Sequence, residues 1–111
     1  MKELIEQASI GPTVLKQYMK EAADEGCRLV QIHANRITGG YQLIYSLALE
    51  YRLINLEMVI SEDTRVESIS SIYPAAQLYE QEMEELFGVQ IVGIAEDPHV
   101  KLYHVKGHPM K

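Results

Sequence analysis

The chain has 111 residues, a length typical of one domain. Hydrophobic residues make up 47% of it and charged residues 23%, a balance typical of a globular rather than a disordered protein. The formal net charge of −6 argues against nucleic acid, whose phosphates require clustered Lys and Arg, and against direct binding to anionic lipid headgroups. The single cysteine, Cys27, excludes an internal disulfide and an all-cysteine cluster site.

The sequence shows no pattern typical of a signal peptide or of a membrane-spanning segment. The N-terminus lacks the apolar run of a signal peptide, and no segment approaches the roughly 18–20 apolar residues that a bilayer-spanning helix needs. We therefore expect an intracellular, soluble chain that meets a membrane only through a partner. We expect one α+β domain over residues 1–98, followed by a basic tail over residues 99–111 with three lysines, three histidines and no carboxylate.

The first elements are a weak strand and a helix. Residues 3–8 give a faint signal for a short edge strand. Pro12 is tolerated in the first turn of a helix, so the Gly-Pro-Thr segment around it predicts a helix start. Apolar residues then recur at helical spacing until Gly26, a residue type that favours a helix C-terminus.

Three strands are expected to follow, because apolar and polar residues alternate over residues 30–34, 41–49 and 54–60. The pair Gly39-Gly40 is a hairpin signal, since glycine reaches positive φ at little cost. The pattern predicts an antiparallel meander with one apolar face, covered by the helix over residues 11–25. Residues 61–67 are polar and are expected to form a loop.

A second helix is expected from Pro74 to Gly88. On a helical wheel, one apolar arc contains Tyr79, Met83, Leu86, Ala75, Ala76 and Phe87. Glu82 falls inside this arc, where a carboxylate needs a partner: a basic residue or backbone N–H groups of this domain, or an arginine of another subunit. The carboxylates of Glu80, Glu84 and Glu85 fall at its border or on the polar face, and Glu84 and Glu85 are expected to form an ordinary solvated surface.

Few other residues suggest chemistry. No histidine, lysine or serine is placed beside the helix carboxylates for acid–base work. His104 and His108 have the spacing of helical metal ligands, but the glycine and proline beside them disfavour a helix, so a chance cluster is the simpler interpretation. A small metal-binding protein using these two and His99 remains the alternative from a different functional class. Cys27 is expected to be a buried or half-buried thiol, and His33 to be structural.

The segment from Ile69 to Val89 closely resembles the signature of the family of the 30-kilodalton subunit of respiratory complex I, also called the C subunit of NADH-quinone oxidoreductase. That signature has Ser-Ile, aromatic-Pro-Ala, then aromatic, Glu-Arg-Glu, an acidic residue and Leu-Phe-Gly. The residues of this chain that match it are Tyr73, Pro74, Tyr79, Glu80, Glu82, Glu85, Leu86, Phe87 and Gly88. Gln81 replaces the usual arginine, and residues 93–101 only loosely resemble the Gly-His-Pro-Asp segment that normally follows.

The resemblance extends over residues 5–101 in the order of the elements, with Leu43-Ile44-Tyr45 similar to the family. It implies a fold of three to four strands in a small antiparallel or mixed sheet with two main helices packed on it. The short length resembles the D subunit of Ech-type energy-converting [NiFe]-hydrogenases.

For function, the resemblance implies a non-catalytic accessory subunit of a membrane-bound complex, peripheral on the cytoplasmic face and without a cofactor of its own. Such a subunit packs on a large subunit and lies near an iron–sulfur small subunit, so the [NiFe] centre and iron–sulfur clusters are expected in those partners. The equivalent subunit of a complex I-like oxidoreductase is the alternative. The matching residues named above form the expected partner interface, with Glu82 and Phe87 as its anchor or as a helix-positioning pair.

Overall fold

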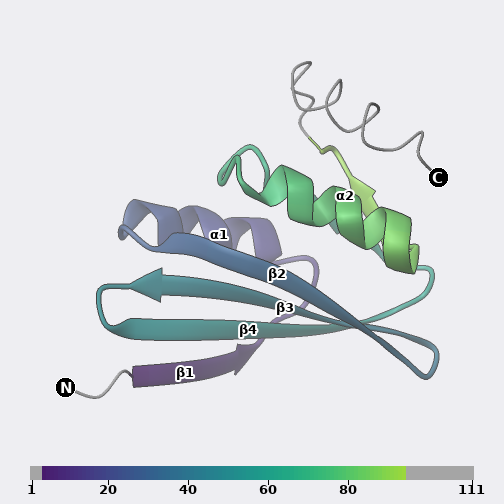
Figure 1. The fold of residues 1–111 in the computed structure, drawn as a ribbon, viewed down its shortest axis with the longest axis horizontal. Helices are drawn as coiled ribbons and strands as arrows, with labels where there is room; N and C mark the ends of the chain where they lie inside the picture. Colours follow the sequence, from purple (N-terminus) through teal and green to yellow (C-terminus); the bar gives the residue numbers. More distant parts are fainter. Residues whose placement is uncertain (1–3, 95–111) are drawn as a thin grey trace.

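The structure is a computed structural model that describes residues 4–94, and the side chains from residue 7 onward. It contains a four-stranded mixed sheet, a two-stranded sheet and two helices, which confirms the expected α+β fold (Figure 1). The large sheet has the strand order β1-β4-β3-β2. Its members are β1 (Leu4–Ser9), β2 (Arg28–Ile37), β3 (Gly40–Leu49) and β4 (Arg52–Ser61).

The meander of β2, β3 and β4 is antiparallel as predicted, and the weak first strand is real. β1 lies parallel to β4 at the edge, with Leu4 opposite Arg52 and Ser9 opposite Glu57. Gly39 has a φ of +79° in the hairpin between β2 and β3, which confirms the glycine signal. Gly40 is required for a different reason: a Cβ there would lie 1.9 Å from the carbonyl oxygen of Ile60 on β4.

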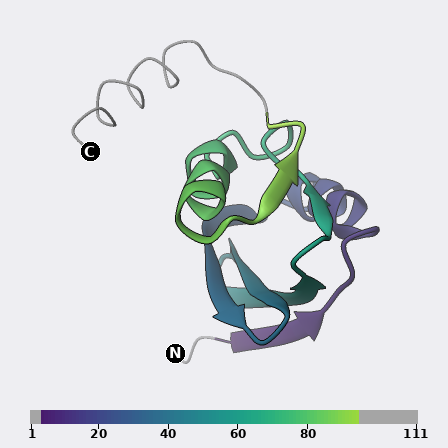
Figure 2. The ribbon, with the colours of Figure 1, turned by 90° about the vertical axis from the view of Figure 1, so that its right-hand side faces the viewer.

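Both helices, α1 (Leu15–Asp24) and α2 (Ala76–Phe87), lie on the same side of the large sheet (Figures 1 and 2). The apolar side chains that alternate along β3 and β4 point to this side and form the core with residues of both helices. Its fully buried members on these four elements are Leu15, Met19, Leu43, Tyr45, Leu47, Leu56, Met58 and Ala76. The opposite side of the sheet carries no helix among the described residues.

The expectation of a loop over residues 61–67 is wrong in part. β5 (Arg65–Glu67) forms a parallel pair with β6 (Gln90–Val92), in which the buried Val66 lies opposite the buried Ile91. A strand of three residues is too short to show an alternating pattern, and its partner lies more than twenty residues along the chain. Because β5 precedes α2 and β6 follows it, their pairing joins the two ends of the segment that contains α2. No helix within residues 4–94 has both the length and the apolar character needed to cross a bilayer.

Candidate functional site: the motif helix and its two sides

The family-like motif builds α2 and the turns that lead into and out of it. The helix begins at Ala76, two residues after the predicted start at Pro74, and ends at the predicted place. Gly88 adopts the left-handed conformation with φ +83°, and its N–H donates to the carbonyl oxygen of Glu84 at 3.1 Å. Glycine is the residue type that tolerates this cap at least cost, so the final glycine of the motif ends the helix.

The wheel assigned the wrong carboxylate to the interior. Glu80 is completely buried, whereas Glu82 is exposed. The inner side of the helix is formed by Ala76, Gln77, Glu80 and Met83, of which two are polar. A wheel that ranks positions by apolarity therefore turns the helix away from its true orientation, and Glu82, which the wheel places in the apolar arc, lies outside the buried side of the helix.

Glu80 is held by the segment that precedes the helix. The Ser68 hydroxyl donates to Glu80 Oε1 at 2.6 Å, and the backbone N–H of Ile69 donates to Glu80 Oε2 at 2.8 Å. A 2.8 Å hydrogen bond joins the hydroxyls of Ser68 and Ser70, and the N–H of Ser70 donates to Ser68 Oγ at 3.0 Å. Both carboxylate oxygens are thus engaged, and the buried carboxylate fixes α2 to residues 68–70.

The environment of Glu80 disfavours its charged form. Burial raises the pKa of the Glu80 carboxyl above its usual value, and the nearby Glu84 adds to this, while the hydrogen bonds from Ser68 and Ile69 oppose it. Tyr45, on the sheet beneath, is also fully buried, and its hydroxyl has no hydrogen-bond partner in the described part of the chain. Burial, with a smaller contribution from Glu80, raises the pKa of the Tyr45 phenol.

Sequence reasoning missed this polar cluster of Ser68, Ser70, Tyr45 and Glu80. The available signal was the Ser-Ile-Ser segment at residues 68–70, in which two small hydroxyls flank one apolar residue just before the helix. Periodicity gave no indication of it, because the segment is irregular and contacts a residue more than ten positions later.

Two tyrosines of the motif, Tyr73 just before α2 and Tyr79 in its first half, attach this segment to the start of β2. The Tyr73 hydroxyl donates to the carbonyl oxygen of Cys27 at 2.8 Å, and the Tyr79 hydroxyl donates to that of Val30 at 3.0 Å. Cys27 lies just before β2, and Val30 lies on β2 at the register shift where it has no partner on β3, so the tyrosines bind backbone acceptors at the start of this edge strand. Both residues were predicted at a partner interface; in this chain their hydroxyls bind the chain itself.

The last turn of α2 is attached to the hairpin. The Tyr41 hydroxyl donates to the carbonyl oxygen of Phe87 at 2.7 Å, and Arg36 Nη2 donates to the same oxygen at 3.3 Å. The Arg36 guanidinium also lies 5.6 Å from the centroid of the Tyr41 ring. A carbonyl that the helix itself leaves unpaired is therefore satisfied twice, and the end of the helix has a fixed position.

The outer side of α2 exposes two leucines, Leu78 and Leu86, beside the carboxylates of Glu82 and Glu85. Leu78 is 51% exposed and Leu86 is 70% exposed, unusually high fractions for leucine. A hollow of about 210 Å³ lies between this side and β2, with Glu82, Leu86 and His33 among its lining residues. No hydrogen bond or ion pair of Glu82 is found within residues 4–94. In the described part of the domain, neither a basic residue nor a backbone N–H group pairs with Glu82.

The remaining candidate residues have ordinary surroundings. Cys27 is buried as predicted, and burial raises the pKa of its thiol, helped by Glu25 and opposed by Arg52. His33 is exposed and lies 3.2 Å from Asn35 Oδ1 through its Nε2 atom. The described residues include no group of three His, Cys, Asp or Glu side chains that could hold a metal. The predicted histidine cluster of the tail lies outside the described residues.

The fold is a small α+β domain with both helices on one side of a four-stranded sheet, and a buried glutamate anchors the second of them, α2. This arrangement can be compared with known families. The model of the family "Respiratory-chain NADH dehydrogenase, 30 Kd subunit" matches residues 8–111. The chain therefore belongs to this family.

Two curated relatives are C subunits of NADH-quinone oxidoreductases. The protein of Cereibacter sphaeroides is 31% identical over 74 residues, which cover 64% of this chain and 37% of the relative. The protein of Roseobacter denitrificans is 29% identical over 106 residues, which cover 87% of this chain and 52% of the relative. The chain thus spans about half or less of the length of these relatives.

Two solved structures share the fold. One is a chain of the membrane-bound sulfane sulfur reductase, described as an archaeal respiratory membrane complex; it aligns with a TM-score of 0.71 at 22% identity over 93% of this chain and 70% of that one. The other is a trypsin-resistant fragment of Nqo5, with a TM-score of 0.68 at 16% identity over 80% of each chain. At these identities the likeness concerns the fold.

Proposed function

We propose that this chain is a non-catalytic assembly subunit in the hydrophilic arm of a membrane-bound energy-converting oxidoreductase. It packs on the large subunit through the outer side of α2 and brings no cofactor of its own. The complex in our leading hypothesis is an Ech-type [NiFe]-hydrogenase, with nickel–iron and iron–sulfur centres in the partner subunits. The subunit is peripheral, on the cytoplasmic face of the membrane, and contacts the membrane only through its partners.

One observation carries this proposal: bonds within the chain fix the motif helix on one side, and within residues 4–94 its other side exposes two leucines. Glu80, Tyr79 and Phe87 hold α2 in one position through bonds within the chain. Leu78, Leu86 and the carboxylate of Glu82 are left facing outward. A rigid helix with exposed leucines beside the carboxylates of Glu82 and Glu85 supplies apolar contact area and an electrostatic contact that selects the partner.

The first experiment is to purify the native complex through a tag on this chain, identify its companions and measure nickel and iron in the same sample. A nickel-bearing large subunit together with iron–sulfur and membrane subunits is the expected result. A complex I-like oxidoreductase is the second candidate. The two curated relatives, both C subunits of NADH-quinone oxidoreductases, support it. It would give a similar set of companions with iron but without nickel. Recovery of the chain alone would contradict both.

The second experiment compares substitutions on α2. We expect Glu82→Ala and Leu86→Ala to lower recovery of the large subunit more than Glu84→Ala does. Glu84 is half-buried and accepts a 3.3 Å hydrogen bond from the N–H of Ile91, so it belongs to the inner part of the helix surface. Thermal unfolding of each isolated variant would separate lost assembly from lost folding. Equal recovery of Glu82→Ala and Glu84→Ala at equal stability would refute the assignment of the interface.

A further inference from the structure

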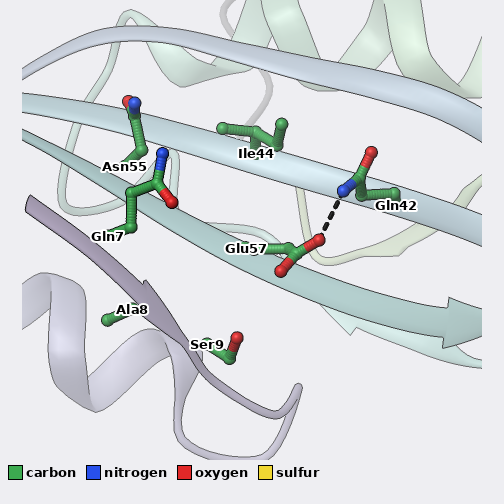
Figure 3. Close-up of a pocket in the computed structure, with 7 residues that line it drawn as sticks. All are labelled: Gln7, Ala8, Ser9, Gln42, Ile44, Asn55 and Glu57. Atoms are coloured by element: carbon green, nitrogen blue, oxygen red, sulfur yellow. Dashed lines mark hydrogen bonds between the residues drawn. The ribbon is translucent and has the colours of Figure 1, made fainter.

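The side of the large sheet that carries no helix among the described residues has a pocket of its own. The pocket has a volume of about 410 Å³, within the usual range for ligand sites, and three strands contribute to it. It is lined by Gln7, Ser9, Gln42, Ile44, Asn55 and Glu57, together with the small Ala8 (Figure 3). We call it the sheet-face pocket. Its lining residues Gln42, Ile44, Asn55 and Glu57 alternate along β3 and β4 with core residues that face the helices, so the pocket lies on the side of the sheet opposite to α2. The proposed large-subunit interface therefore does not include it.

The polar groups of this face are ordered by a chain of hydrogen bonds across the strands. His33 contacts Asn35, the Asn35 amide donates to Gln42 Oε1 at 3.1 Å, and the Gln42 amide donates to Glu57 Oε2. On the neighbouring positions, the Ser46 hydroxyl donates to Asn55 Oδ1 at 2.8 Å. This series of hydrogen bonds therefore runs from the edge strand β2 across β3 to β4 and ends on the carboxylate of Glu57.

Glu57 is left with unused acceptor capacity. Its Oε2 atom receives the Gln42 amide, and within residues 4–94 no group donates to its other oxygen. Figure 3 shows the Gln7 amide and the Ser9 hydroxyl of β1 on the other side of the pocket from Glu57 and Gln42. No lining residue is a lysine or arginine, so the only formal charge of the pocket is negative. A half-buried carboxylate gains most from a cationic donor, and here none comes from the lining residues.

The layout of the acceptors favours a guanidinium over an ammonium ion. Glu57 and the Gln7 amide lie on different strands, β4 and β1, which pair in parallel at the sheet edge. A planar guanidinium presents five N–H donors in a fixed fork and can reach acceptors on both strands, whereas an ammonium acts as a compact point charge. The apolar lining residues are Ala8 and the half-buried Ile44, and the 59% exposed Val59 lies two residues beyond Glu57 on the same face of β4. Arginine is enriched at protein–protein interfaces, so a side chain of a protein partner is the favoured source of the guanidinium.

We propose that the sheet-face pocket receives an arginine side chain of a second protein partner, with Glu57 as its counter-ion. This inference rests on the proposed function in one respect, that the chain works inside an assembly. The inference adds a second interface to the proposed function. This interface lies on the opposite side of the molecule from α2 and binds a guanidinium.

The pocket chemistry is tested on the isolated full-length chain with N-acetyl-arginine amide, and with the neutral N-acetyl-citrulline amide as the matched control. Amide chemical shifts in NMR titrations report the site. We expect saturable shifts at Gln7, Ser9 and Glu57 with the arginine probe, and about tenfold weaker binding with the citrulline probe, because the charge-assisted hydrogen bond is lost. Glu57→Gln should weaken the arginine probe by a similar factor, and Glu62→Gln, an exposed control, should not.

Equal binding of the two probes, an unchanged affinity in Glu57→Gln, or no saturable shifts up to about 50 mM would overturn the proposal and leave a solvated sheet face.

The source of the arginine is tested in the tagged complex. Glu57→Gln should lower recovery of at least one companion severalfold relative to Glu62→Gln. Equal recovery of all companions would refute the second interface while leaving the proposed function intact. If the unmodified chain recovers no companion at all, the proposed function fails, and the probe titration still decides whether the pocket binds a guanidinium.

Discussion

Glu80→Ala is the substitution that most directly tests how the motif helix is held. The truncation removes the acceptors of two buried donors, the Ser68 hydroxyl and the Ile69 N–H. Hydrogen bonds to a charged acceptor are worth about 1.5–3 kcal/mol each, and a lost partner leaves a buried group unsatisfied. The desolvation cost that Glu80 no longer bears offsets part of this loss. We expect a net loss of about 3–5 kcal/mol in the free energy of unfolding, a large share of the roughly 5–15 kcal/mol typical of a domain.

Urea denaturation of the isolated full-length chain, followed by far-UV circular dichroism, measures this loss. Glu82→Ala is the matched control, because it makes the same chemical change two residues along the same helix at an exposed position. Its effect should stay within about 0.5 kcal/mol. Similar transition midpoints for the two variants would refute the anchoring role of Glu80.

Glu80→Gln keeps the prediction testable if the alanine variant does not fold. Its amide retains one oxygen acceptor and places an NH₂ group against the other donor, so we expect an intermediate loss of about 1–2 kcal/mol. A loss as small as that of Glu82→Ala would count against the reasoning in the same way.

Four further outcomes follow from the same contacts. Tyr45→Phe should leave the stability unchanged or raise it by up to about 1 kcal/mol in the same urea assay, because the buried hydroxyl has no partner among the described residues. Tyr41→Phe should cost about 1 kcal/mol, since it removes the 2.7 Å bond to the end of α2. Gly40→Ala should lower the melting temperature strongly, by the equivalent of about 2 kcal/mol or more, because the new Cβ would meet the backbone of Ile60 at 1.9 Å. Because the pKa of Glu80 is raised, the folded state binds the proton of this carboxyl more tightly than the unfolded state does. The stability of the wild type should therefore fall, relative to that of Glu80→Gln, as the pH rises from the ordinary glutamate pKa of 4.5 through the raised pKa.

Much of the architecture was predictable because it depends on local patterns. The alternation over residues 41–49 and 54–60 fixes which side of the sheet is buried, and a register error of one residue would expose the whole core. Gly39, Gly26 and Gly88 end their elements with positive φ, a backbone requirement that a single residue type reveals. These features are properties of short segments, and a sequence displays them directly.

The features that escaped prediction depend on contacts between distant segments. β5 and β6 are three residues each and are stabilised by pairing with one another, so neither has a pattern of its own. Glu80 is buried because Ser68 and the Ile69 N–H satisfy it, and nothing in the composition of α2 indicates those donors. A helical wheel assumes that polar residues such as Glu80 lie on the solvent side of a helix. A carboxylate with two internal donors can instead lie in the core.

The spacing of the two matched glutamates would allow one motif to serve both folding and the proposed recognition of a partner. Residues two apart on an α-helix point about 200° away from each other, so Glu80 and Glu82 must lie on opposite sides of α2. Once Ser68 and Ile69 hold Glu80 inward, Glu82 is directed outward beside Leu86 whatever the neighbouring surface contains. The inner carboxylate therefore sets the rotation of the helix, and the rotation selects which side chains a partner meets. Damage to Glu80 should impair recognition through the position of the helix, whereas damage to Glu82 should impair recognition alone.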